Sequence, residues 1–150
     1  MILIAHRGNI NGPNPKMENH PEYIESALYM GYDVEVDVWA IGGKFFLGHD
    51  EPRHEIDWKL LNRSGLWCHA KNSSALSTML SIGVHCFWHQ EDNHTITSKG
   101  YIWSHPNADR NRSAIQVKLD FSPGIMGSCL GICSDYVEKY RNISHDGSKK

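Results

Sequence analysis

The sequence predicts an α/β fold built on a parallel β-sheet. The first fifty residues contain three apolar runs of strand length, 2–6, 33–38 and 45–47, and a segment with helical spacing separates the first two. Apolar residues occupy both faces of the first run, which is typical of a strand buried on both sides. Each run ends in ionisable residues, so we expect these strands to carry reactive side chains to one edge of a sheet.

Alternation and turn residues predict each element of the first half. Pro21 fits the first turn of a helix, Gly31 fits its end, and Gly42-Gly43 marks a hairpin turn. The predicted elements are a strand at 2–6, a loop at 9–20, a helix at 21–30, a strand at 33–38, a hairpin at 39–48, a short helix near 56–62, a strand at 66–71 and a helix at 72–81.

The second half predicts shorter elements with little room for helices between them. Strands are expected at 84–88, 101–103, 114–119 and 130–133, with a turn or short helix at 96–97 and a helical start after 135. A chain of 150 residues corresponds to one domain. We place this domain at 1–141, followed by a polar, frayed tail at 142–150.

The strand at 33–38 has an unusual division of its side chains. Its three valines share one face, while Asp33, Glu35 and Asp37 share the other. Three acids on one buried face repel one another unless a cation neutralises them. The alternative is a solvent-facing strand of an antiparallel sheet, which the strand–helix–strand order disfavours.

Composition indicates an ordinary soluble protein. The net charge is −2, so the chain lacks the basic footprint of a nucleic-acid-binding protein, and the mean hydropathy is −0.47. No signal-peptide pattern follows Met1, and no apolar run approaches the ~20 residues of a membrane span. The four cysteines are expected to be free thiols, mostly buried, which predicts a cytoplasmic location.

Four short motifs occur in order within the first fifty residues: His6-Arg7-Gly8, Glu18-Asn19, Glu35-x-Asp37 and His49-Asp50. In this order and spacing they resemble the glycerophosphodiester phosphodiesterase family. The resemblance implies a (β/α)₈ (TIM-like) barrel, which typically needs ~250 residues. We therefore expect a shortened TIM-like barrel of seven or eight short strands, with several outer helices reduced or missing. An open α/β sheet is the alternative.

The resemblance also implies roles for individual residues. His6 and His49 match the catalytic histidines, and Glu35 and Asp37 match a metal-binding pair. Glu18 matches a glutamate that either binds the metal or orients Arg7; a helix-entry cap is its structural alternative. Arg7 and Lys71 are expected to bind the substrate phosphate.

One position departs from the family pattern. The family usually has Glu-x-Lys on its third strand, whereas this chain has His69-Ala70-Lys71. Two hard carboxylates favour Mg²⁺ or Ca²⁺, but imidazole is a poorer ligand for those ions and suits Mn²⁺, Zn²⁺ or Fe²⁺ better. Either His69 is a metal ligand and the metal preference shifts, or water replaces the missing carboxylate and affinity falls.

The sequence thus predicts a metal-dependent phosphodiesterase that hydrolyses a small glycerophosphodiester-like substrate with two histidines. The cofactor is expected to be Mg²⁺ or Ca²⁺, with Mn²⁺ as the further option. A non-catalytic phosphate-binding or sugar-phosphate-binding module is the alternative. A thinly covered barrel exposes apolar surface that a homodimer would bury, so the oligomeric state stays open. The esterified alcohol is not predicted.

Overall fold

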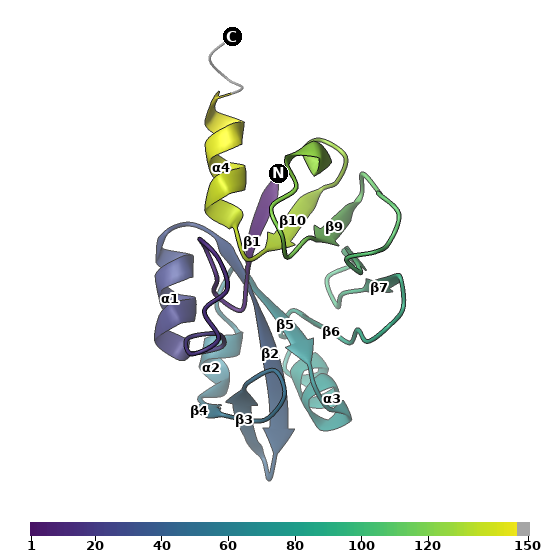
Figure 1. Cartoon of the computed structure of the whole chain (residues 1–150). Helices are drawn as coiled ribbons and strands as arrows, with labels where there is room; N and C mark the ends of the chain where they lie inside the picture. Colours follow the sequence, from purple (N-terminus) through teal and green to yellow (C-terminus); the bar gives the residue numbers. More distant parts are fainter. Residues whose placement is uncertain (147–150) are drawn as a thin grey trace.

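The computed structural model describes residues 1–146, where the strands form one curled, half-barrel sheet (Figure 1). The strands are β1 (Ile2–His6), β2 (Asp33–Ile41), β3 (Lys44–Leu47), β4 (His54–Ile56), β5 (Leu66–Ala70), β6 (Cys86–Phe87), β7 (His94–Ile96), β8 (Ile102–Ser104), β9 (Ala114–Val117) and β10 (Gly131–Ser134). The helices are α1 (Pro21–Tyr29), α2 (Trp58–Leu61), α3 (Ser73–Ser81), α4 (Val137–Asp146) and the 3₁₀ turn η1 (Pro123–Ile125).

Strand β2 is the centre of the sheet. Its first residues pair with β1 on one edge, β5 pairs along the opposite edge, and β3 pairs with its last residues beyond the end of β1. The strands β6, β5, β2, β1, β10, β9 and β8 lie in this order and run parallel. Their C-terminal ends therefore share one edge, while β3, β4 and β7 add antiparallel pairs.

The convex face of the sheet is covered by short helices in the first half of the chain. Ile24 and Ala27 of α1, and Ala75 and Met79 of α3, are buried against the aliphatic residues of β2 and β5. Helix α3 begins where the Asn72 side chain accepts a hydrogen bond from the backbone of Ala75 (2.9 Å). This cover buries the valine face of β2, as its alternation predicts.

The concave face is filled by aromatic side chains that span the sheet. Trp67 of β5 lies 5.8 Å from Trp103 of β8 between ring centroids, and Phe87 of β6 lies 4.5 Å from Trp103. These contacts connect strands that are not hydrogen-bonded neighbours, and offset aromatic pairs at such distances are favourable. The aromatic layer forms an apolar floor beneath the edge where the parallel strands end.

The prediction of a shortened TIM-like barrel is wrong. The described chain is mostly strand, its ten strands form a half-barrel sheet, and helices do not alternate with strands through it. Between β6 and β10 the connections are turns and loops, with η1 as the helical segment in the described residues. The physical reason is length, because stretches such as 88–93 and 105–113 are too short and too polar to form a covering helix.

The C-terminal helix crosses the predicted domain boundary. Helix α4 packs on β1 and β10 and continues past residue 141 to Asp146. Residues 147–150 of the predicted tail lie outside the described part of the chain. None of the helices described has the length and apolar character needed to cross a membrane.

Candidate functional site

A left-handed turn after β1 sets the position of two site residues. His6 is the last residue of β1, and the chain then turns through Arg7 (φ 53°) and Gly8 (φ 90°). A Cβ at Gly8 would lie 2.8 Å from Tyr23 Cδ1, so glycine lets α1 pack against this turn. The Arg7 backbone N donates to Glu35 O (2.9 Å), which fixes the turn beside β2.

Strands β2 and β5 bring two acids and a histidine together. Glu35 and Asp37 are buried on the concave face of β2, with 3% and 1% of their surface exposed. Asp37 and His69 are register partners in adjacent parallel strands. His69 Nδ1 lies 3.6 Å from Glu35 Oε1 and 3.4 Å from Asp37 Oδ1. One donor atom from each residue lies within 4.8 Å of the others, which suits a shared metal ion.

The orientation of the His69 ring is fixed by two contacts. Its Nε2 lies 2.8 Å from the backbone oxygen of His89, and because a carbonyl only accepts, Nε2 carries a hydrogen. The ring also stacks on Phe87, with centroids 5.0 Å apart and planes 8° from parallel. Both contacts turn Nδ1 toward the two carboxylates.

Asp37 is the most highly connected acid of the site. Its Oδ2 lies 3.0 Å from Arg7 Nε and accepts a hydrogen bond from Asn19 Nδ2 (2.9 Å), and its Oδ1 lies 3.6 Å from Lys71 Nζ. Burial alone would raise the pKa of Asp37, but the contact with His69 and the charge of Arg7 outweigh burial and lower it. The Asp37 carboxylate is therefore ionised at neutral pH.

Two carboxylate oxygens of this group lack hydrogen-bond partners. Glu35 Oε2 and Asp37 Oδ1 are buried and accept no hydrogen bond within the described residues. For Asp37 Oδ1 the neighbouring cations of His69 and Lys71 lie at ion-pair distance only. Buried carboxylate oxygens without donors are costly, so this observation fits a site for a divalent cation.

In the ion-free protein the His69 imidazole lies within ion-pair distance of both acids. Burial lowers the pKa of His69, but its contacts with Asp37 and Glu35 outweigh burial and raise it to about 9. A protonated His69 therefore neutralises the acids when no ion is bound. Proton and metal ion would compete for the same Nδ1 atom.

Asp135 is a site residue to which the sequence analysis gave no role. It follows β10, the neighbour of β1, and its Oδ1 lies 2.8 Å from His6 Nδ1 and accepts from Asn9 Nδ2 (2.8 Å). Burial lowers the pKa of His6, but Asp135 and the charge of Glu35 outweigh burial and raise it. With Nδ1 bound to Asp135, the Nε2 atom of His6 faces the cavity side, 4.0 Å from Glu35 Oε2.

Glu18 lies outside the group formed by Glu35, Asp37 and His69. Its Oε2 accepts from Arg7 Nη1 (3.2 Å) and its Oε1 accepts from Asn9 Nδ2 (2.9 Å). Its contact with Arg7 agrees with the expectation that Glu18 orients Arg7, and it is not part of the acid–histidine group.

His49 reaches the same edge on a tight loop after β3. Gly48 has φ 151°, and a Cβ there would collide with the backbone oxygen of Glu51. The Gly48 backbone N donates to Asp37 O (3.1 Å), so the loop is fixed beside β2. His49 is partly exposed, and its Nδ1 lies 2.7 Å from Asp50 Oδ1.

Six of the eight predicted site residues line one small cavity of about 160 Å³. Its polar lining is His6, Arg7, Glu35, Asp37, His49, His69 and His89, and its apolar lining is Trp103, Pro106, Val117 and Leu119. Lys71 Nζ lies 3.6 Å from Asp37 Oδ1 but does not line the cavity, and Glu18 lines a neighbouring recess together with Arg7 and His49. Both catalytic candidates thus share one cavity with the acid–histidine group.

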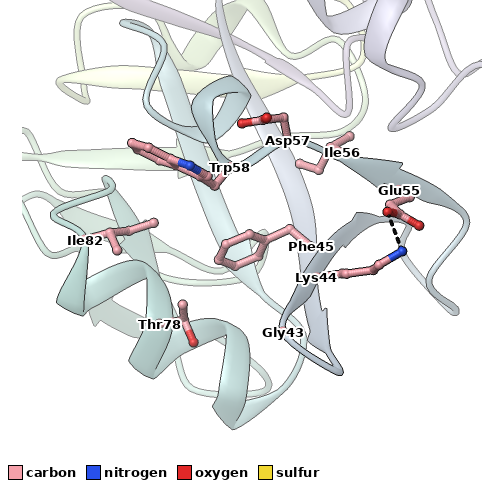
Figure 2. Close-up of a pocket in the computed structure, with 9 residues that line it drawn as sticks. All are labelled: Gly43, Lys44, Phe45, Glu55, Ile56, Asp57, Trp58, Thr78 and Ile82. Carbon is pink, nitrogen blue, oxygen red and sulfur yellow. Dashed lines mark ion pairs between the residues drawn. The ribbon is translucent and has the colours of Figure 1, made fainter.

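A larger recess of about 670 Å³ lies elsewhere, between β3, β4, α2 and α3 (Figure 2). Phe45, Trp58 and Ile82 line it, and its charged groups are engaged in the structure. Lys44 Nζ pairs with Glu55 Oε1 (2.8 Å), and Asp57 caps α2. Size therefore does not identify the candidate site, because the smaller cavity holds the histidines and the buried acids.

Comparisons of this chain with protein-family models, with curated proteins and with solved structures found no match.

Proposed function

We propose that this protein is a metal-dependent phosphodiesterase that hydrolyses a small glycerophosphodiester-like substrate. The observation that carries the proposal is the convergence of His6, His49, Glu35, Asp37 and His69 on one cavity. Phosphodiester hydrolysis needs a cation near the phosphoryl oxygens, a base for the nucleophile and an acid for the leaving alcohol. The ordered motifs of the first fifty residues support the same reaction class.

Glu35, Asp37 and His69 would hold the divalent cation. Their donors are close, buried and in part without other partners, which is the donor set such an ion needs. When bound, the cation supplies positive charge to the phosphate oxygens. Arg7 and Lys71 flank Asp37 and add two further positive charges for the same phosphate.

His6 acts as the general base in this proposal. The carboxylate of Asp135 binds Nδ1, holds the ring in one orientation and stabilises the imidazolium formed when Nε2 accepts a proton. His6 is well buried, so bulk water does not compete strongly for that position. The proton comes from the nucleophile, either water or a substrate hydroxyl next to the phosphate; the second would first give a cyclic phosphodiester.

His49 acts as the general acid. It lies on the partly exposed side of the cavity, where a leaving alcohol departs and solvent can restore the lost proton. The bond between phosphorus and the alcohol oxygen breaks, and His49 delivers its proton to that oxygen. The products are an alcohol and a phosphate monoester, or the cyclic diester where a substrate hydroxyl attacks.

The test is a ³¹P NMR assay on glycerophosphodiesters with different alcohols, in the presence of Mn²⁺, Zn²⁺, Mg²⁺ or Ca²⁺. We expect a metal-dependent monoester signal that the His6→Ala, His49→Ala double variant loses by at least ~10³-fold. The matched control is His94→Ala, because His94 is exposed on β7 outside the cavity. Full activity of the double variant would reject the proposal.

The second candidate is a phosphate-binding module without turnover. One observation favours it: the His69 imidazole lies within ion-pair distance of both acids and can neutralise them without a metal ion. Tight binding of a phosphodiester, unaffected by metal removal and followed by no product across the panel, would support this candidate over hydrolysis.

A further inference from the structure

We infer that the group formed by Glu35, Asp37 and His69 selects a divalent transition-metal ion such as Zn²⁺ or Co²⁺ over Mg²⁺ and Ca²⁺, with His69 Nδ1 as a ligand. The inference deepens the proposed function, because it names the ion class of the same site. It concerns binding alone, so it can fail or hold whether or not the protein hydrolyses a phosphodiester.

The position of the His69 imidazole favours Nδ1 as a metal ligand. His69 Nδ1 lies 3.4 and 3.6 Å from oxygens of Asp37 and Glu35, at the same concave face. An ion contacting both carboxylates there would meet Nδ1 as its third protein donor. The sequence left open whether His69 or a water molecule completes the site, and this placement favours His69.

Two contacts hold the His69 ring in one orientation. The hydrogen on Nε2 is committed to the His89 carbonyl, so in the neutral ring Nδ1 carries the lone pair. Histidine ligands of metal ions commonly donate their other ring hydrogen to a backbone carbonyl in this way. The stacked Phe87 ring restricts rotation further. This imidazole is therefore preorganised as a ligand.

Few carboxylate oxygens are available to an ion at this site. Ca²⁺ takes six to eight oxygens and Mg²⁺ requires a near-ideal octahedron, usually of oxygens. Three further carboxylates contact cavity residues: Glu18 is engaged by Arg7 and Asn9, Asp135 by His6 and Asn9, and Asp50 by His49. A hard ion would have to rely on two carboxylates and water.

Two fixed positive charges also lie next to the site. Arg7 and Lys71 lie 3.0 and 3.6 Å from the Asp37 carboxylate and reduce the negative potential that attracts a hard cation. A bond to a neutral imidazole depends less on that potential. Late first-row ions therefore lose less from the two fixed cations than Mg²⁺ or Ca²⁺ would.

The test uses untagged, chelator-treated protein without substrate. Calorimetric titration should give affinities in the order Zn²⁺, Co²⁺, Mn²⁺, then Mg²⁺ and Ca²⁺, with Zn²⁺ at least ~100-fold tighter than the last two. Pulsed EPR of the Mn²⁺ complex should show coupling to a ¹⁴N nucleus. This signal needs no variant, so it decides the role of an imidazole even if a substituted protein folds poorly.

The matched variant is His69→Glu, which restores an all-oxygen donor set. It should remove the ¹⁴N coupling, weaken Zn²⁺ binding by ~10–100-fold and tighten Mg²⁺ or Ca²⁺ binding. His94→Glu is the control and should change none of these values. The inference is overturned if the wild type lacks the nitrogen coupling, or if it binds none of the ions while His69→Glu binds them. The latter result would show that a protonated His69 permanently replaces the cation.

Discussion

The two halves of the chain contribute to the cavity in different ways. The first half, through α3, supplies most of its ionisable side chains and the helices that cover the convex face of the sheet. The second half forms short strands joined by loops and supplies the apolar wall, the His89 carbonyl and Asp135. Most ionisable groups of the cavity thus lie on, or directly after, strands of the helix-covered half, and the thinner half contacts two of them, His6 and His69.

Asp37→Asn, in the first half of the chain, should reduce catalysis more than any other substitution considered. Asp37 contacts Asn19, Arg7, His69 and Lys71, so its loss removes a proposed ligand and disturbs the phosphate-binding cations. We expect kcat/KM to fall by at least ~10³-fold. Asp92→Asn, in an exposed loop of the second half, should leave kcat/KM unchanged. Comparable losses in both variants would contradict the division between the halves.

A pair of isoleucines tests the packing side of the comparison. Ile24→Ala empties a fully buried position between α1 and the sheet and should cost ~2–5 kcal/mol of unfolding free energy. Ile96→Ala on β7, where the side chain is 70% exposed, should change it by less than ~0.5 kcal/mol. Urea unfolding measures both; equal losses would mean that β7 is covered in solution, for example by a second copy.

Two histidines, one in each half of the chain, have pKa values shifted in opposite directions. The pKa of His69 is raised to about 9, so its contribution to the stability of the metal-free protein is full below pH 6.5 and is lost as pH rises through 9. Burial and Lys99 lower the pKa of His85 to about 4, so its contribution is full above pH 6.5 and is lost as pH falls through 4.

The shift of His69 corresponds to about 3 kcal/mol in unfolding free energy, and that of His85 to less, because solvent partly screens the His85 ring. Chelator-treated protein should therefore be most stable near pH 6.5. His69→Gln should flatten the alkaline limb alone, and His85→Gln the acid limb alone. An alkaline limb that His69→Gln leaves unchanged would refute the ion pair with the two acids.

The smallest effect is expected at Asp135, the orienting residue from the second half. Asp135→Asn should lower kcat by ~10–100-fold, because His6 loses the carboxylate that orients it and stabilises its charged form. The pKa of His6, measured by NMR, should fall as well, since burial then dominates. Asp120→Asn is the exposed control. A reduced kcat with an unchanged His6 pKa would indicate a purely structural role.

The difference between the two halves of the chain also explains which features could be predicted from the sequence. The alternating valines and acids of β2 gave its faces correctly, and the strand at 2–6 and the helix at 72–81 are confirmed within one residue. The fold class was wrong because it extended the pattern of the first fifty residues to a half without covering helices. Strands β4 and β7 were missed because three residues carry no readable period.

The parts of the site that sequence could not reveal are long-range or lie on the backbone. Asp135 reaches His6 across 129 residues because β10 pairs with β1, and the local sequence around Asp135 does not specify that contact. The partner of His69 Nε2 is a backbone carbonyl, which any residue at position 89 could provide. The identity of the His69 side chain was readable, whereas the direction of its ring was not.

The most direct measurement is a crystal structure of the metal-freed protein soaked with Zn²⁺, with anomalous data on both sides of the zinc edge. We expect one strong peak within ~2.0–2.2 Å of carboxylate oxygens of Glu35 and Asp37 and of His69 Nδ1. No peak at this position, with the imidazole still lying against both acids, would contradict it.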